Sequence, residues 1–185
     1  MDRLFNPFRY IAGTKSLVLG LIFMVSAVFL LYSAGMIQDG YLHIAPTDAT
    51  IWSILLMQLL WWIVPALFYY VGGLLLSRSH IRIVDVLGTT AFAQLLLIPM
   101  IAPMLLPAVK NGMNTILQAL QQGVQPAMGD MMAVMISGIV SALFIVLFFI
   151  WNYNAFATSC NVRGWKAVLY FVVVQLVVTF VGVLV

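Results

Sequence analysis

Long runs of apolar residues make up most of this chain, and short polar segments separate them. Each run has close to the roughly 20 residues that a helix needs to cross the hydrocarbon core of a bilayer. Asp, Glu, Lys, Arg and His are absent from all of the runs. Because a segment in lipid must satisfy its own backbone hydrogen bonds, each run is predicted to be a helix. The five predicted spans are residues 16–37, 50–76, 86–107, 131–153 and 167–185.

Composition agrees with a chain that lies almost wholly in a membrane. Of its 185 residues, 64% are hydrophobic and only 7% are charged, whereas soluble domains carry about 25% charged residues. The first apolar run is longer than the 7–15 residues of a signal-peptide core, so we expect it to be retained as a span. The predicted fold is therefore all-α: a polytopic bundle of five transmembrane helices that forms a single domain, residues 16–185, after an interfacial segment, residues 1–15.

The positions of the Lys and Arg residues predict how the bundle is oriented. Seven of the eight fall in the N-terminal segment and in the second and fourth connections, which share one side of the membrane. Lys110 alone falls on the opposite side. Short loops rich in Lys and Arg face the cytoplasm, so the N-terminus is predicted to be cytoplasmic and the C-terminus external. The seven residues are Arg3, Arg9, Lys15, Arg78, Arg82, Arg163 and Lys166.

Two segments outside the spans have the patterns of short helices at the membrane surface. Asn6 and Pro7 suit the N-cap and first position of a short helix near the N-terminus. Apolar residues recur at helical spacing between Met113 and Val124, with glutamines among them and Gly123 near the expected C-terminal cap. We expect an interfacial segment on the cytoplasmic side and an amphipathic helix on the outer surface, which either caps a cavity or lies passively on the membrane.

The chain offers little catalytic or metal-binding chemistry. His43 and His80 fall in loops on opposite sides of the membrane, and Cys160 is the single cysteine. Neither a nucleophile-elbow motif nor a phosphate-binding loop is present. We therefore expect no enzymatic activity, cofactor, metal or nucleic-acid partner, and we expect Cys160 to be an idle thiol rather than a lipidation site.

Amides and prolines are the polar or helix-bending features within the spans. They have two interpretations: amides that hold helices together and prolines that bend them to fit, or groups that line a path for a solute. The first interpretation is the commoner in membrane proteins, and the residues alone leave both open. Two pairs of small residues four positions apart, Ser137 with Ser141 and Gly138 with Ala142, also predict a close helix contact, either within one subunit or between subunits. The candidate positions are Gln58, Pro65, Gln94, Pro99, Pro103, Asn152 and Gln175.

The cations of the second and fourth connections form the other candidate site. Arginine binds lipid phosphates or partner carboxylates with its forked guanidinium. The same residues are explained equally well if they serve only to orient the protein in the membrane. The candidate contacts for a partner or a lipid are Arg78, Arg82, Arg163 and Lys166.

The arrangement of these features resembles the Yip1 domain family. The similarity lies in Gly72-Gly73, the segment from Ile83 to Gly88, Pro99, and the stretch from Trp151 to Ala167, and it covers most of the chain. The resemblance implies five spans with an N-in, C-out topology. Eukaryotic members act in vesicle trafficking and associate with Rab GTPases through an extended cytosolic N-terminal region. Only about 15 residues precede the first span here, so the resemblance implies a compact prokaryotic-type member.

Two functions follow from these expectations. The first is a non-enzymatic interaction or scaffold protein in membrane organisation or trafficking, which contacts the bilayer and assembles with itself or with another membrane protein. The second is a small transporter, or the membrane subunit of a transport complex, with Gln58 and Gln94 on its path. In both cases the expected location is the cytoplasmic (inner) membrane of a prokaryote, since the chain shows no organelle signal.

Overall fold

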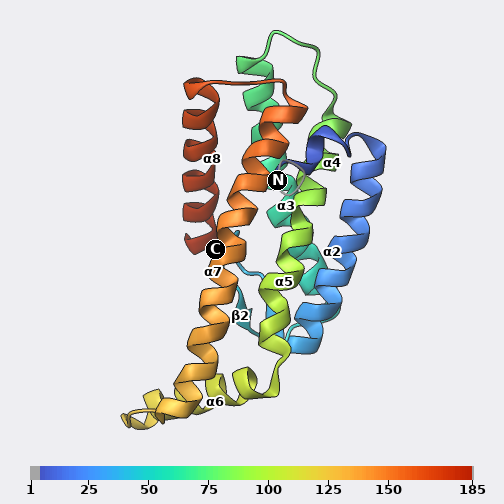
Figure 1. The fold of residues 1–185 in the computed structure, drawn as a ribbon. Helices are drawn as coiled ribbons and strands as arrows, with labels where there is room; N and C mark the ends of the chain where they lie inside the picture. The colour runs from blue at the N-terminus through green and yellow to red at the C-terminus, as the bar shows by residue number, and fades with distance from the viewer. Residues whose placement is uncertain (1–4, 185) are drawn as a thin grey trace.

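The computed structural model describes residues 5–184, and most of them are in helices (Figure 1). Five helical segments within this range are long and apolar enough to cross a membrane. The prediction of an all-α protein that is integral to a membrane is therefore confirmed. The segments are α2 (Thr14–Ala34), α3 (Ile51–Leu76), a composite third span (Ile83–Leu105), α7 (Met128–Ser159) and α8 (Trp165–Leu184).

The third span is interrupted, in contrast to the other four. The α-helical hydrogen bonding of α4 (Ile83–Ala93) gives way to the 3₁₀ turn η2 (Gln94–Leu96). The short helix α5 (Leu97–Ile101) and the 3₁₀ turn η3 (Ala102–Leu105) complete the span. Pro99 and Pro103 fall in the second half, where each removes a backbone donor and crowds the preceding turn. By comparison, α3 is assigned as one helix through Pro65.

The third span is also the centre of the bundle. Of its most apolar window, 61% is buried, against 11% for α7 and 33% for α2. It packs against α2, α3 and α7. Two glycines permit the close approach to α2: a Cβ built at Gly20 would lie 2.4 Å from the backbone carbon of Ala91, and one built at Gly88 would lie 2.7 Å from the Gly13 carbonyl oxygen. Small residues therefore set the distance between these helices.

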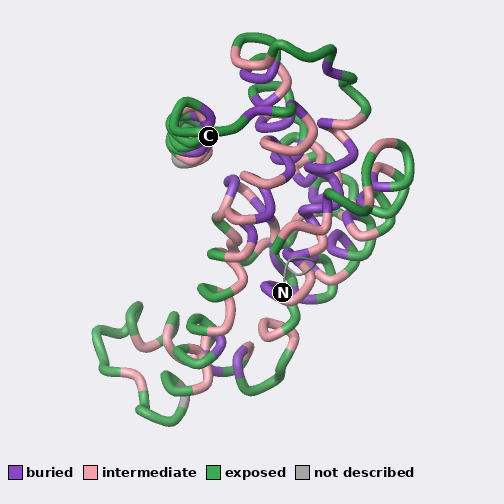
Figure 2. Tube along the Cα trace, turned by 45° about the horizontal axis from the view of Figure 1, so that its top comes forward, coloured by how far each residue is buried: buried purple, intermediate pink, exposed green. Residues whose placement is uncertain are grey.

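The serine pair predicted in the fourth span makes its contact within the subunit. The Ser141 hydroxyl donates to the Met100 carbonyl at 3.1 Å, and Ser137 is buried on the same side of α7. Gly138, by contrast, has open space where a Cβ would lie. Most of the described residues in the first half of α7 are exposed or half-buried, and the lower part of the trace in Figure 2 is accordingly mostly green and pink.

The connection between α2 and α3 enters the bundle. Two short antiparallel strands, β1 (Met36–Ile37) and β2 (Ala45–Pro46), pair at its base. In Figure 1 the C-terminal end of α8 lies beside the middle of α7, with β2 below it. Gly40 packs against Gly182 of α8, and the side chain of Tyr41 is 1% exposed. Non-helical backbone is tolerated among spans when protein buries it, as it does here.

The predicted amphipathic helix is present as α6 (Pro107–Gln122), which lies across the end of the bundle (Figure 1). It ends at Gly123 in the left-handed conformation, as the sequence predicted. The Lys110 ammonium donates to the Ser33 carbonyl oxygen at 2.9 Å and so ties α6 to the end of α2. We refer to this as the α6 end of the bundle. The opposite end, with the start of α2 and the α3–α4 and α7–α8 connections, is called the basic end.

The N-terminal segment forms a 3₁₀ turn, η1 (Pro7–Arg9), with Asn6 at the predicted N-cap position and Pro7 first in the turn. The Asn6 side chain makes no capping hydrogen bond. Instead, Phe8 is 1% exposed and packs between Phe92 and Trp151, with ring centroids 6.1 and 5.9 Å away. The turn is therefore held by tertiary packing. Arg3 lies outside the described residues.

Candidate functional site

The turn between α7 and α8 organises the basic end. Asn161 has a φ of 50°, the left-handed conformation that Asn tolerates better than most residues. Its side-chain amide donates to the Ser79 hydroxyl at 2.9 Å, which links this turn to the α3–α4 connection. The neighbouring Cys160 and Val162 are buried. The turn is thus fixed to the bundle, and Arg163 is exposed on it.

One pocket lies between this turn and the α3–α4 connection. It has a volume of about 300 Å³, and its lining includes Arg78, Ser79, Asn161, Arg163 and Lys166. We call it the Arg78 pocket. Three of the four cations predicted as contacts therefore meet in one depression. The fourth, Arg82, is exposed immediately before α4 and is not among the residues that line this pocket.

A second pocket lies on the other side of the same turn. It has a volume of about 430 Å³, and its lining includes Arg9, Asn154, Thr158, Asn161 and Arg163. We call it the Arg9 pocket. Asn161 and Arg163 line both pockets, so the two depressions adjoin.

Arg9 was not among the predicted contacts, because it is 154 positions before Arg163 in the sequence. The fold brings it there by attaching η1 to α7. The Asn154 amide donates to the Phe5 carbonyl at 2.8 Å, and the burial of Phe8 holds the turn in place. The charge of the N-terminal segment was visible in the sequence, but the contact with α7 was not.

The cations of the two pockets have no acidic partner in the part of the chain that the structure describes. The ion pair found there is His43 with Asp39, 2.6 Å apart, at the other end of the bundle. At the basic end the described carboxylate is Asp85, in the first turn of α4 and beside Gly13. It makes no ion pair, so Arg9, Arg78, Arg163 and Lys166 are free to attract an anion.

Cys160, next to these pockets, is not a reactive group. Its side chain is fully buried, with the sulfur 3.5 Å from the Tyr69 carbonyl oxygen. Burial raises the pKa of the thiol to about 11. The thiolate is the nucleophilic form, so the thiol is inert at neutral pH.

The polar residues predicted within the spans lie between the helices. Gln58 of α3 donates to the Gln94 side-chain oxygen at 3.5 Å, where the third span first departs from α-helical geometry. The Asn152 amide bonds the Phe148 carbonyl of its own helix at 2.9 Å. Pro65 is buried inside α3, whereas Pro99 and Pro103 line a groove between the third span, α6 and α7. The Gln58–Gln94 contact joins two helices, as an amide bridge does.

Gln175 belongs to a second buried group, which includes residues that sequence reasoning missed. Its amide donates to the hydroxyl of Tyr69, and the hydroxyl of Tyr41 lies beside both. Tyr41 reaches this position from the α2–α3 connection, where its ring packs 5.7 Å from that of Phe148. Burial raises the pKa of Tyr41 to about 12, so the phenol is neutral. A tyrosine in a predicted outer loop carries no signal of such burial.

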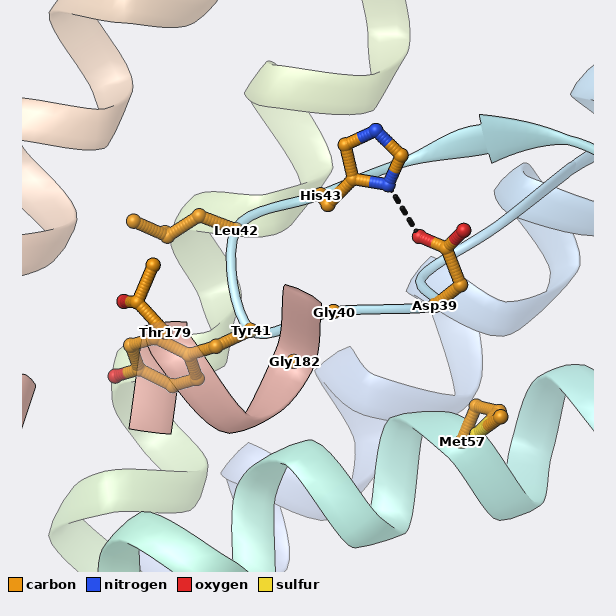
Figure 3. A pocket seen from close by; sticks show the side chains of 8 residues that line it. All are labelled: Asp39, Gly40, Tyr41, Leu42, His43, Met57, Thr179 and Gly182. Atoms are coloured by element: carbon orange, nitrogen blue, oxygen red, sulfur yellow. Dashed lines mark hydrogen bonds and ion pairs between the residues drawn. The ribbon is translucent and has the colours of Figure 1, made fainter. Parts of the chain in front are cut away.

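A third depression, of about 490 Å³, opens at the α2–α3 connection (Figure 3). His43 and Asp39 face each other on one side of it, and Met57 and Thr179 lie on other sides. His80 is in the α3–α4 connection at the basic end, so the two histidines are on opposite ends of the bundle, as predicted. Residues 5–184 contain no cluster of three or more potential metal ligands.

No protein-family model, curated protein or solved structure matches this chain. The resemblance to the Yip1 domain family therefore stays a prediction.

Proposed function

We propose that this protein is a non-enzymatic membrane scaffold, Yip1-like in kind, that holds an acidic segment of a partner protein on its cytoplasmic face. The observation that carries the proposal is the Arg78 pocket, where Arg78, Arg163 and Lys166 meet without a carboxylate among the described residues. The basic end faces the cytoplasm in this proposal because its loops hold nearly all of the Lys and Arg residues.

The pocket suits carboxylates of a protein segment. Two guanidinium groups offer forked donors, which match carboxylates in bidentate geometry, and Lys166 adds a flexible point charge. The three side chains are exposed, so each ion pair would contribute only about 0.2–1 kcal/mol. Such a surface acts mainly on the rate of association and on partner choice, and binding falls as salt is added.

Photo-crosslinking in the native membrane tests this proposal. A photoreactive amino acid replaces His80, which is exposed beside the pocket, in the full chain. We expect a discrete adduct whose yield falls at high salt and in the R78Q/K166Q variant. The matched control is K15Q/R82Q, which removes two charges from the same end but leaves the pocket lining intact. An adduct that both double variants reduce equally, or that neither reduces, would contradict the proposal.

A transport component is the second candidate, supported by the interrupted third span and its Gln58–Gln94 contact. Helices that break within the membrane expose backbone groups that can coordinate a solute. If the two amides line a path, Q58L and Q94A abolish solute flux in liposomes while the protein stays folded. Q118A, an exposed amide on α6, is the control. Unchanged flux in both variants, or no flux in the wild type, would leave the scaffold as the better function.

A further inference from the structure

We propose that the Arg9 pocket binds the phosphate group of an anionic membrane lipid. This site is separate from the partner site of the Arg78 pocket, although Arg163 lines both. The inference goes beyond the scaffold function and does not depend on it. Three observations support it: the positions of Arg9 and Arg163, the N-terminus of α8 beside the pocket, and the location of the pocket near the ends of the spans, where lipid headgroups lie.

The two arginines of the pocket extend from backbone segments that packing and hydrogen bonds hold in place. Arg9 ends η1, whose Phe8 is 1% exposed and whose neighbour Phe5 accepts from Asn154 at 2.8 Å. Arg163 follows the turn that Asn161 attaches to Ser79. Both arginines line one pocket, and no described carboxylate is paired with either. Two forked guanidiniums without counter-ions are a typical arrangement for phosphate.

The N-terminus of α8 adds to the attraction. Gly164 lines the pocket, and its carbonyl accepts the bonds from the N–H groups of Ala167 and Val168, at 3.2 and 3.3 Å. The N–H groups of Trp165 and Lys166 therefore precede the first hydrogen-bonded turn of this 20-residue helix. The positive end of a helix dipole and these free donors favour an anion beside Gly164.

The position of the pocket identifies the lipid as the source of the phosphate. Its wall includes Tyr153 and Thr158 near the end of the α7 span, at the level where α8 begins. Large apolar or aromatic side chains are exposed around it: Trp165 is 71% exposed and Tyr10 is 60% exposed. Such aromatic residues lie at the headgroup level of a bilayer. A headgroup of the surrounding leaflet would therefore reach the pocket laterally, without an acyl chain having to leave the membrane.

Lipid titration of the full-length wild type in detergent, followed by native mass spectrometry, tests the inference. The probes are phosphatidic acid and phosphatidylglycerol, with phosphatidylcholine as the zwitterionic comparison. We expect both anionic lipids to bind tighter than phosphatidylcholine. R9Q and R163Q are each expected to weaken their binding by about fivefold, the upper end of what an exposed ion pair contributes.

Matched variants separate this site from general surface charge and from the partner site. K15Q removes a charge from the same N-terminal region, and R78Q removes one from the other pocket. Both are expected to leave anionic-lipid binding within about twofold of the wild type. Partner crosslinking should show the reverse sensitivity to R78Q, so the two proposals can fail separately.

Four results would overturn the inference. Equal affinity for the three lipids would show that the headgroup charge is not read, and an equal loss in K15Q and R9Q would show that only net charge matters. Full competition by millimolar inorganic phosphate would assign the pocket to a soluble anion. Binding of a poly-aspartate peptide that depends on Arg9, without binding of the anionic lipids, would assign it to an acidic protein segment.

Discussion

Polar side chains in the interior of the bundle and cations at the basic end differ in how they are satisfied. Gln58 contacts Gln94, and Gln175 contacts Tyr69, so these amides within the spans find partners on neighbouring helices, whereas Asn152 bonds within its own helix. Arg9, Arg78, Arg163 and Lys166 make no ion pair with any described residue. Burying a polar group without a hydrogen-bond partner costs free energy, whereas water solvates an exposed cation, which therefore remains available to bind a ligand. The interior polar groups therefore hold the helices together, and the basic end is the part suited to binding.

The largest expected effect comes from the close contact between α2 and the third span. In G20A the new Cβ would lie 2.4 Å from backbone atoms that cannot move aside, so we expect a loss of about 1–3 kcal/mol in unfolding free energy. G138A is the matched control: a Cβ there meets nothing within 4 Å. Because Ala favours helices over Gly, G138A should be neutral or stabilising. Reversible unfolding in mixed micelles measures both, and equal destabilisation would contradict the packing.

The buried Gln175–Tyr69 contact should carry the next largest effect. Q175L and Y69F each leave a buried polar group with one partner fewer. We expect each to lose about 0.6–2 kcal/mol, and the double variant to lose less than the sum because the two groups interact. A double-mutant cycle on unfolding free energies measures this coupling. Strict additivity would show that the two side chains do not interact and that this buried pair does not hold α3 and α8 together.

At the basic end, the turn that contains Asn161 places Arg163 in the lining of both pockets. N161A forces a left-handed φ on a residue that resists it, at a cost of about 1–2 kcal/mol. N161G keeps the backbone conformation and loses only the hydrogen bond to Ser79. We therefore expect N161A to reduce unfolding free energy and crosslinking at the pocket more than N161G does. Equal losses in the two variants would show that the side-chain hydrogen bond, which both remove, and not the backbone conformation fixes the turn.

The smallest effect is expected at Cys160. Its pKa is raised by burial from 9.0 to about 11, so between these pH values the unfolded chain loses the thiol proton before the folded chain does. Stability is therefore unaffected by this group below pH 9 and falls as pH rises toward 11. C160A should remove this part of the alkaline loss in a pH series of unfolding. At pH 7 we also expect maleimide to label Cys160 in the denatured protein but not in the folded wild type.

Much of the fold was predictable because hydrophobic length is a local property. All five spans were found, and α6 ends at the predicted Gly123. The boundaries were less accurate. The fourth span was predicted to end at Tyr153, but α7 continues to Ser159 because Ala155 and Phe156, beyond Tyr153, are buried inside the bundle. The Pro-containing third span was expected to bend, but its subdivision into four helical pieces was not predicted.

The candidate site was predictable only in part. Arg78, Arg163 and Lys166 were named from their charge and their place in short loops, and they do share a pocket. Arg82 does not line it, and Arg9 lines the adjoining one. Charge and loop assignment are visible along the chain, but whether two loops touch depends on how their helices pack. Tyr41 is the clearest example, since its burial beside Gln175 depends on a non-helical segment entering the bundle.

The sequence by itself determined that this chain lies in a membrane, which segments are helical, and that nearly all of its Lys and Arg residues are on one side. These properties follow from the free energy of transferring each apolar or charged side chain between water and lipid. That free energy depends mainly on the residue itself and little on its neighbours in the fold. The tertiary structure alone decided which amides meet, which loop is buried and which cations share a pocket. Those depend on close packing between segments far apart in sequence, such as Gly20 against Ala91 and Phe8 against Trp151.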